Sequence, residues 1–106
     1  MINDGIAERH KKTLFKILAD CPKVKQVILF GSRAMGSYTT QSDIDIALVG
    51  DELTLTDQTK ILDAIEQTNI PQKVDIVLCR TISSDELLNH IEEFGVEWDV
   101  FVGVRG

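Results

Sequence analysis

The chain has 106 residues, of which 43% are hydrophobic and 26% charged, and its net charge is −6. A folded protein of this mass buries about 65% of the surface of its unfolded chain, so we expect one compact domain over 1–106. The apolar fraction excludes a disordered chain, and no apolar run reaches the roughly 20 residues of a membrane span. Two cysteines without an export signal indicate reduced thiols, so we expect a cytoplasmic protein that does not enter a membrane.

Charge is distributed unevenly along the chain. Residues 1–42 hold 7 Lys or Arg against 3 Asp or Glu, whereas residues 43–106 hold 4 against 14. An acidic protein repels a phosphate backbone, which argues against general nucleic-acid binding. The basic residues of the first half predict the solvated side of an amphipathic helix, with a docking face as the alternative.

The chain opens with a predicted helix and a predicted strand. The helix begins after Asn3 or Asp4 and continues to about Asp20, and Pro22 prevents it from going further. The Val-Ile-Leu-Phe run within residues 25–30 predicts a strand that is buried on both faces.

A short helical turn is expected over residues 32–36, and a polar loop over 37–42. Residues 43–49 then predict a second strand, because apolar side chains occupy every other position. The alternation sets Ile44, Ile46 and Leu48 against Asp43, Asp45 and Ala47.

The second half of the chain repeats the pattern of helix and strand. Thr54 or Thr56 can cap a long helix that ends near Thr68, and residues 73–79 predict a third strand.

The last predicted helix begins at Ser83, which forms a capping box with Glu86, and ends near Gly95. An edge strand can follow, because apolar residues alternate in the tail: Val96, Trp98, Val100, Val102 and Val104. The order of elements predicts a small α/β (α+β) domain with a mixed sheet.

Three aspartates interrupt these apolar strands. Asp43 and Asp45 are two residues apart and therefore project from one face, while Asp75 lies on the next strand along the chain. Clustered carboxylates suit Mg²⁺ or Mn²⁺, which share their coordination sphere with substrate phosphates. The alternative is a solvent-exposed sheet face on which the aspartates are incidental.

Gly31 and Ser32 end the first strand and open the helical turn. Glycine allows the backbone to approach a ligand closely, and the N–H groups of the turn can face an anion. Ser32 adds a hydroxyl and Arg33 a positive charge, although Gly-Ser-Arg alone is also an ordinary turn. The Walker A and dinucleotide-binding fingerprints are absent.

Together, Gly31-Ser32, the Asp43-Ile44-Asp45 triplet ten residues later and Asp75 resemble the nucleotidyltransferases with a polymerase-beta-like catalytic core. The run VILFGSRAMGSYTTQSDIDIALV over 27–49 looks like the minimal nucleotidyltransferase (MNT) subfamily. The resemblance covers about residues 14–96. It implies the nucleotidyltransferase fold, in which helices pack mainly on one face of a small mixed sheet.

The resemblance also implies a catalytic mechanism. Asp43 and Asp45 would bind two Mg²⁺ ions that bridge the triphosphate of ATP, and Asp75 would hold the ion that activates the acceptor hydroxyl. The residues that would contact the phosphates are Gly31, Ser32 and Arg33. An acceptor oxygen would attack the α-phosphorus, and pyrophosphate would leave.

MNT proteins resembling this one are commonly encoded beside a helical HEPN protein, as the antitoxin of a toxin–antitoxin pair. The resemblance therefore implies transfer of AMP to a hydroxyl, expected to be a tyrosine, of a HEPN partner. The alternative is a non-catalytic subunit that binds nucleotide or masks its partner, as the apolar residues around Trp98 would permit. A metal-dependent sugar transferase would leave Gly31-Ser32 unexplained.

Other features carry less information about function. His10 and His90 have no acidic or cysteine neighbour at ligand spacing, so we expect ordinary surface or boundary residues. The motif identifies neither the nucleotide base nor the oligomeric state, so homo-oligomers and hetero-oligomers both remain open.

Overall fold

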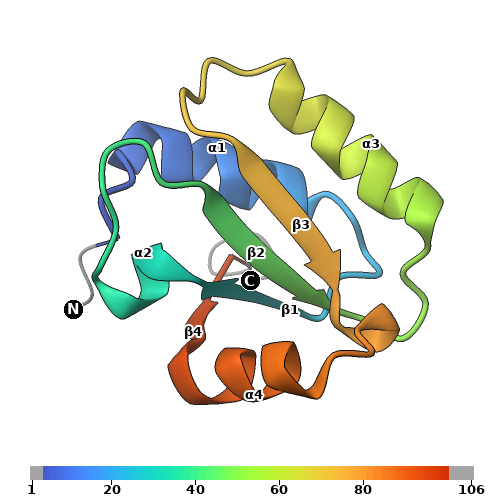
Figure 1. The fold of residues 1–106 in the computed structure, drawn as a ribbon. Helices are drawn as coiled ribbons and strands as arrows, with labels where there is room; N and C mark the ends of the chain where they lie inside the picture. Colours follow the sequence, from blue (N-terminus) through green and yellow to red (C-terminus); the bar gives the residue numbers. More distant parts are fainter. Residues whose placement is uncertain (1–3, 101–106) are drawn as a thin grey trace.

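The computed structural model describes residues 4–100. In chain order its elements are α1 (Glu8–Ala19), β1 (Gln26–Phe30), α2 (Ser32–Met35), β2 (Ile44–Val49), α3 (Leu55–Glu66), β3 (Val74–Leu78), the 3₁₀ turn η1 (Cys79–Thr81), α4 (Asp85–Phe94) and β4 (Val96–Trp98). The strands form one sheet in the order β3-β2-β1-β4. β2 and β3 are parallel, and β1 is antiparallel to both of its neighbours, which confirms the predicted mixed α/β architecture (Figure 1).

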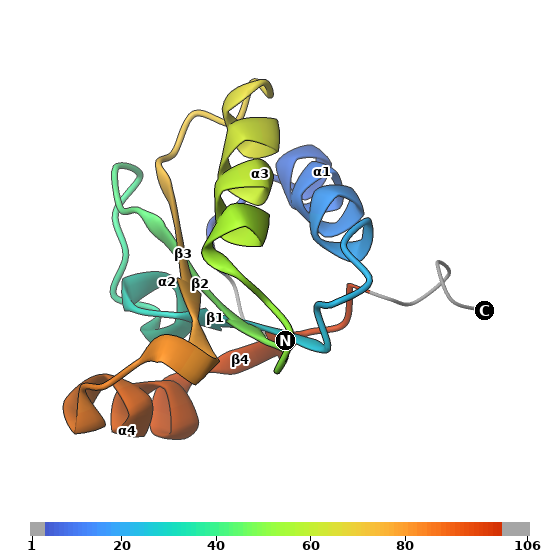
Figure 2. The same cartoon turned by 90° about the vertical axis from the view of Figure 1, so that its right-hand side faces the viewer.

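The two faces of the sheet are covered differently. α1 and α3 lie on one face, and α4 lies on the other (Figure 2). The main core forms under α1 and α3, where Leu14 and Leu18 of α1 and Ile61 and Ile65 of α3 meet the strands. The alternate strand residues that complete this core are Ile44, Ile46, Leu48, Val74, Ile76 and Leu78. A smaller cluster joins α4 to the opposite face through Phe30, Ala47 and Ile91.

α1 begins about one turn later than predicted, at Glu8, because Asp4 is not its cap. The buried Asp4 carboxylate accepts a hydrogen bond from the Ile6 amide at 3.1 Å and forms an ion pair with Lys11 at 2.6 Å. The carboxylate thus fastens the segment before α1 instead of starting the helix. Asn3 lies outside the described residues.

The caps of the later helices follow local chemistry. Thr54 caps α3 in a reciprocal capping box with Asp57, as one of the two predicted positions. The predicted capping box at Ser83 is wrong, because the cap of α4 is Ser84, whose Oγ accepts from the Leu87 amide at 3.2 Å.

The chain after α4 forms the predicted edge strand. β4 pairs with β1, and Trp98 is buried against Phe15, with 5.2 Å between the ring centroids. Trp98 and Val100 therefore belong to the core of this chain, while Val102 and Val104 lie outside the described residues. None of the helices within residues 4–100 is long and apolar enough to cross a membrane.

Candidate active site

The sheet brings two of the predicted site residues together. Asp45 on β2 and Asp75 on β3 are register partners in the parallel ladder, so their side chains project from the same face. Asp43 precedes β2 by one residue and is exposed. The three aspartates Asp43, Asp45 and Asp75 form an acidic row. This row lies on the sheet face opposite α1 and α3, in a part of that face that α4 does not cover.

The electrostatics of this row disfavour three negative charges. Burial raises the pKa of Asp45 above its ordinary value, and repulsion from Asp75 and Asp43 raises it further. His90 and Lys73 act in the opposite direction. Lys73 lies 3.7 Å from an oxygen of Asp75, but both side chains are well exposed, so this ion pair is weak. The row therefore favours binding of a further cation.

Gly31 forms the wall that faces Asp45. Its φ of +77° is a conformation that side chains disfavour, and a Cβ at this position would overlap the carboxylate of Asp45. Ser32 follows as the first residue of α2 and is partly buried. The predicted Gly31-Ser32 turn thus lies directly against the acidic row.

The structure adds a residue to this site that the sequence did not indicate. The amide of Gly31 donates a hydrogen bond to Nε2 of His90 at 3.1 Å. The His90 ring contacts Phe30 edge-on and packs near Phe94, with centroid distances of 6.1 and 5.4 Å. His90 is half-buried, as expected for a boundary residue, and in addition it contacts the Gly31 turn.

Sequence spacing could not reveal the contact of His90 with Gly31. Its partner is a backbone amide 59 residues away, not a nearby carboxylate or thiolate. The usable signal is helical periodicity: His90 follows Leu87 by three residues and precedes Phe94 by four, which places the three on one side of α4.

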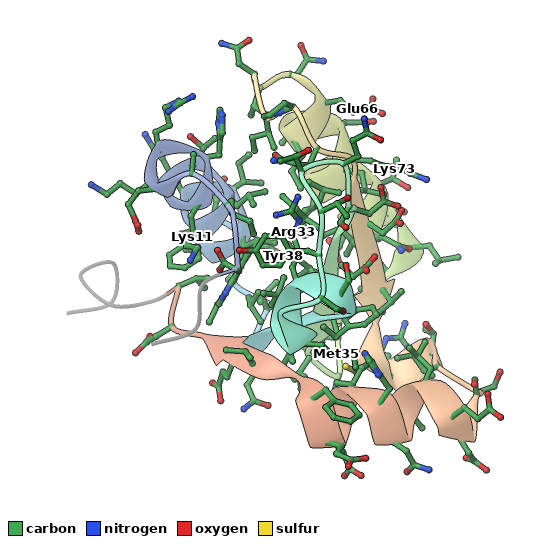
Figure 3. The ribbon with its side chains drawn as sticks, turned by 60° about the vertical axis from the view of Figure 1, so that its left-hand side comes forward. Lys11, Arg33, Met35, Tyr38, Glu66 and Lys73 are labelled. Carbon is green, nitrogen blue, oxygen red and sulfur yellow. The ribbon has the colours of Figure 1, made fainter. Side chains whose placement is uncertain are left out.

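Arg33 has a different environment from the one expected for a phosphate ligand. Its side chain is only 1% exposed, and its guanidinium donates hydrogen bonds to three backbone carbonyls at 2.8–3.3 Å. The acceptors are the carbonyl oxygens of Asp4, Thr39 and Ser42. The guanidinium also lies over the Tyr38 ring, between α1 and the loop after α2 (Figure 3). This environment argues against phosphate binding by Arg33 and for a role in fixing that loop.

The donor set fits Mg²⁺, although no group of three His, Cys, Asp or Glu side chains within residues 4–100 is arranged to hold a metal ion. Mg²⁺ needs only one or two protein carboxylates when waters and substrate phosphates complete its octahedron. Asp45 together with Asp43 or Asp75 supplies such a set, and burial together with repulsion from Asp75 and Asp43 raises the pKa of Asp45.

A hollow of about 420 Å³ lies between the end of α3 and β3. Its wall includes Leu62 and Ile65 from α3 and Asp75 from β3. Gln72 also lines it, and among the described residues the buried Oε1 of Gln72 has no hydrogen-bond partner.

This combination of a glycine turn and an acidic sheet row agrees with the comparison to known proteins. Residues 12–97 match the family described as "Polymerase beta, Nucleotidyltransferase". The chain belongs to this nucleotidyltransferase family. It is accordingly an enzyme of the nucleotidyltransferase class.

Relatives of this nucleotidyltransferase have more specific descriptions. It is 38% identical over 90 residues to a protein of Methanocaldococcus jannaschii named "Putative protein adenylyltransferase MJ1379", which covers 83% of this chain and 86% of the relative.

Two solved structures share its fold. One is a toxin–antitoxin with AMP-PNP, with a TM-score of 0.69, 28% identity and coverage of 84% of this chain and 72% of the other. The second is an AMPylated Shewanella oneidensis HEPN toxin in complex with MNT antitoxin, with a TM-score of 0.65, 24% identity and coverage of 86% and 71%. At that lower identity the second likeness concerns the fold alone.

Proposed function

We propose that this nucleotidyltransferase transfers AMP from ATP to a tyrosine hydroxyl of a HEPN-type partner and thereby acts as the antitoxin of the pair. The observation that carries this proposal is the in-register pair Asp45 and Asp75 facing the Gly31 turn. The name of the Methanocaldococcus jannaschii relative and the likeness to a toxin–antitoxin structure with AMP-PNP support the choice of AMP and of the partner.

The three aspartates divide the work in this proposal. Asp43 and Asp45 hold Mg²⁺ together with the triphosphate, and Asp75 holds the ion on the acceptor side. When bound, Mg²⁺ supplies positive charge that stabilises the attacking and leaving oxygens. Asp75 also takes the proton of the acceptor hydroxyl. The acceptor oxygen bonds to the α-phosphorus, the bond from that phosphorus to the bridging oxygen breaks, and pyrophosphate leaves.

Gly31 and Ser32 hold the β- and γ-phosphates through their backbone amides and the Ser32 hydroxyl. Positioning matters here because the protein contributes mainly orientation and charge neutralisation to phosphoryl transfer. Gly31 suits this role because its backbone lies against Asp45, where a larger residue would overlap the carboxylate. The phosphates and the cations they share are thereby kept close to the acidic row.

The acceptor approaches from the β3 side of the sheet. β3 is an edge strand, and the Asp75 side chain on it is 44% exposed. A tyrosine from another protein can therefore reach this carboxylate without any rearrangement of the sheet.

The test combines the purified protein with Mg-ATP and the HEPN protein encoded beside it, and follows the intact mass of the partner. Wild type should add the mass of AMP to the partner and silence it. Asp43→Asn should lower the transfer rate by at least about 100-fold, because one carboxylate that holds the cation is lost. Asp63→Asn, which changes an exposed aspartate on α3, is the matched control and should transfer AMP normally.

Masking without catalysis predicts a different result. The partner would be neutralised with no change in mass, and Asp43→Asn would neutralise it as well as wild type. That outcome would overturn the proposed transfer reaction. Of the apolar tail residues that suggested masking, Trp98 and Val100 are buried in the core of this chain, and Phe101 lies outside the described residues.

A further inference from the structure

The amide of Gly31 is already occupied in the free protein. It donates to Nε2 of His90 at 3.1 Å, so any anion that binds this amide must take the place of the imidazole nitrogen. Such an anion would then lie beside the displaced ring, because a hydrogen-bonded oxygen stands about 3 Å from the same amide. His90 is consequently within reach of whatever the Gly31 turn binds.

Apart from the Ser32 hydroxyl, no side-chain donor has so far been assigned to the triphosphate. Arg33, which is the nearest arginine in sequence, is buried and donates to backbone carbonyls. Lys73 is 72% exposed and lies beside Asp75, on the acceptor side. His90 therefore fills a position for which the sequence suggested Arg33.

We propose that His90 is a nucleotide-binding residue of this site, which holds the Gly31 amide in the free protein and donates from Nε2 to a phosphate oxygen when ATP takes that amide. The inference rests on the proposed function, because it assumes that the Gly31-Ser32 turn receives the phosphates of ATP.

The exchange requires no net uptake of a proton. An imidazole nitrogen that accepts a hydrogen bond carries no hydrogen, so in the free protein the ring hydrogen is on Nδ1 and not on Nε2. The other neutral tautomer carries the hydrogen on Nε2 and can donate to a phosphate. Phe30 and Phe94 pack against the ring, which keeps it beside Gly31.

The test measures the Kd of Mg-ATP and the kinetics of AMP transfer for wild type, His90→Ala and His90→Gln. His90→Ala should raise Kd and KM for ATP about tenfold, equal to about 1.4 kcal/mol, and change kcat less than about threefold. His90→Gln should restore most of the affinity, because its amide can both accept from Gly31 and donate to a phosphate. His10→Ala removes the histidine of α1 and is the matched control.

Two outcomes would overturn the role of His90. His90→Ala could bind Mg-ATP as tightly as wild type or more tightly, or His90→Gln could fail to restore affinity. Failure of wild type itself to bind ATP or transfer AMP would instead overturn the proposed function.

A spectroscopic readout on wild type keeps the inference testable if His90→Ala does not fold. Saturation with Mg-ATP should change the ¹⁵N signals of the His90 ring from the Nδ1–H to the Nε2–H tautomer and shift the Gly31 amide. A shift of Gly31 without any change in the ring signals would show that His90 does not contact the nucleotide.

Discussion

The same strands form both faces of the sheet, but one face forms the apolar core and the other carries the acidic site. In β2, Ile44, Ile46 and Leu48 point toward α1 and α3 and are completely buried. Asp45 points the other way, beside Asp75, where burial and repulsion raise the pKa of Asp45. Neighbouring residues of one strand thus point to opposite faces, one into the stabilising core and the next into the acidic row, where the negative charges repel one another.

The contrast between the apolar face and the acidic face shows how a domain of this size can tolerate three neighbouring carboxylates. Apolar burial on the α1–α3 face contributes roughly 1.5–3 kcal/mol for each large side chain. That contribution can offset the unfavourable ionisation of carboxylates on the other face. The smaller cluster under α4 stabilises less, but it brings His90 to Gly31.

Removal of a core side chain should have the largest effect on stability. Ile46→Ala, on the α1–α3 face, should lower the free energy of unfolding by about 2–5 kcal/mol, because it leaves a cavity in the main core. Val77→Ala, on the opposite face, should cost only about 1 kcal/mol, because Val77 is partly exposed. Urea unfolding monitored by circular dichroism measures both. Equal losses would show that the two faces do not differ in their contribution to stability.

The Gly31 turn should show an intermediate effect. Gly31→Ala should lower the free energy of unfolding by about 1–3 kcal/mol and abolish binding of Mg-ATP, because the new Cβ meets the Asp45 carboxylate at a positive φ.

Gly36→Ala is the matched control for the backbone strain. Gly36 also has a positive φ, of +83°, but no atoms surround the position of its Cβ within 4 Å. This variant should show the conformational cost of about 1–2 kcal/mol and keep its ATP affinity. If both variants lose affinity equally, the contact with Asp45 is not the reason that Gly31 is needed.

The smallest expected change in the free energy of unfolding is an increase, in contrast to the losses above. Asp45→Asn should inactivate AMP transfer and yet raise the free energy of unfolding by about 1 kcal/mol at pH 7. A carboxyl whose pKa is raised by folding stabilises the folded state only at low pH, and this contribution disappears as the pH rises through the folded pKa. The gain over wild type should therefore be present at pH 7 and vanish in acid, where Asp45 is protonated in both states.

Thermal unfolding between pH 3 and pH 8 tests this sign, with Asp63→Asn as the exposed control. A loss of stability in Asp45→Asn at pH 7 would contradict the view that the acidic row is strained.

The sequence alone determined the elements of the fold and the acidic strand positions. Period-two alternation predicted β2 and β3, and Thr54 was one of two predicted caps of α3. These signals are local, because the strand period and the capping hydrogen bonds depend on residues a few positions apart. The motif formed by Gly31-Ser32 and the three aspartates pointed to the nucleotidyltransferase family for the same reason.

Only the tertiary structure decided what surrounds that motif. Arg33 and His90 carry no local signal of their partners, since the guanidinium reaches carbonyls as distant as that of Asp4 and the imidazole meets an amide 59 residues away. Contacts of this kind depend on which elements the folded chain brings together, and short-range periodicity does not specify them.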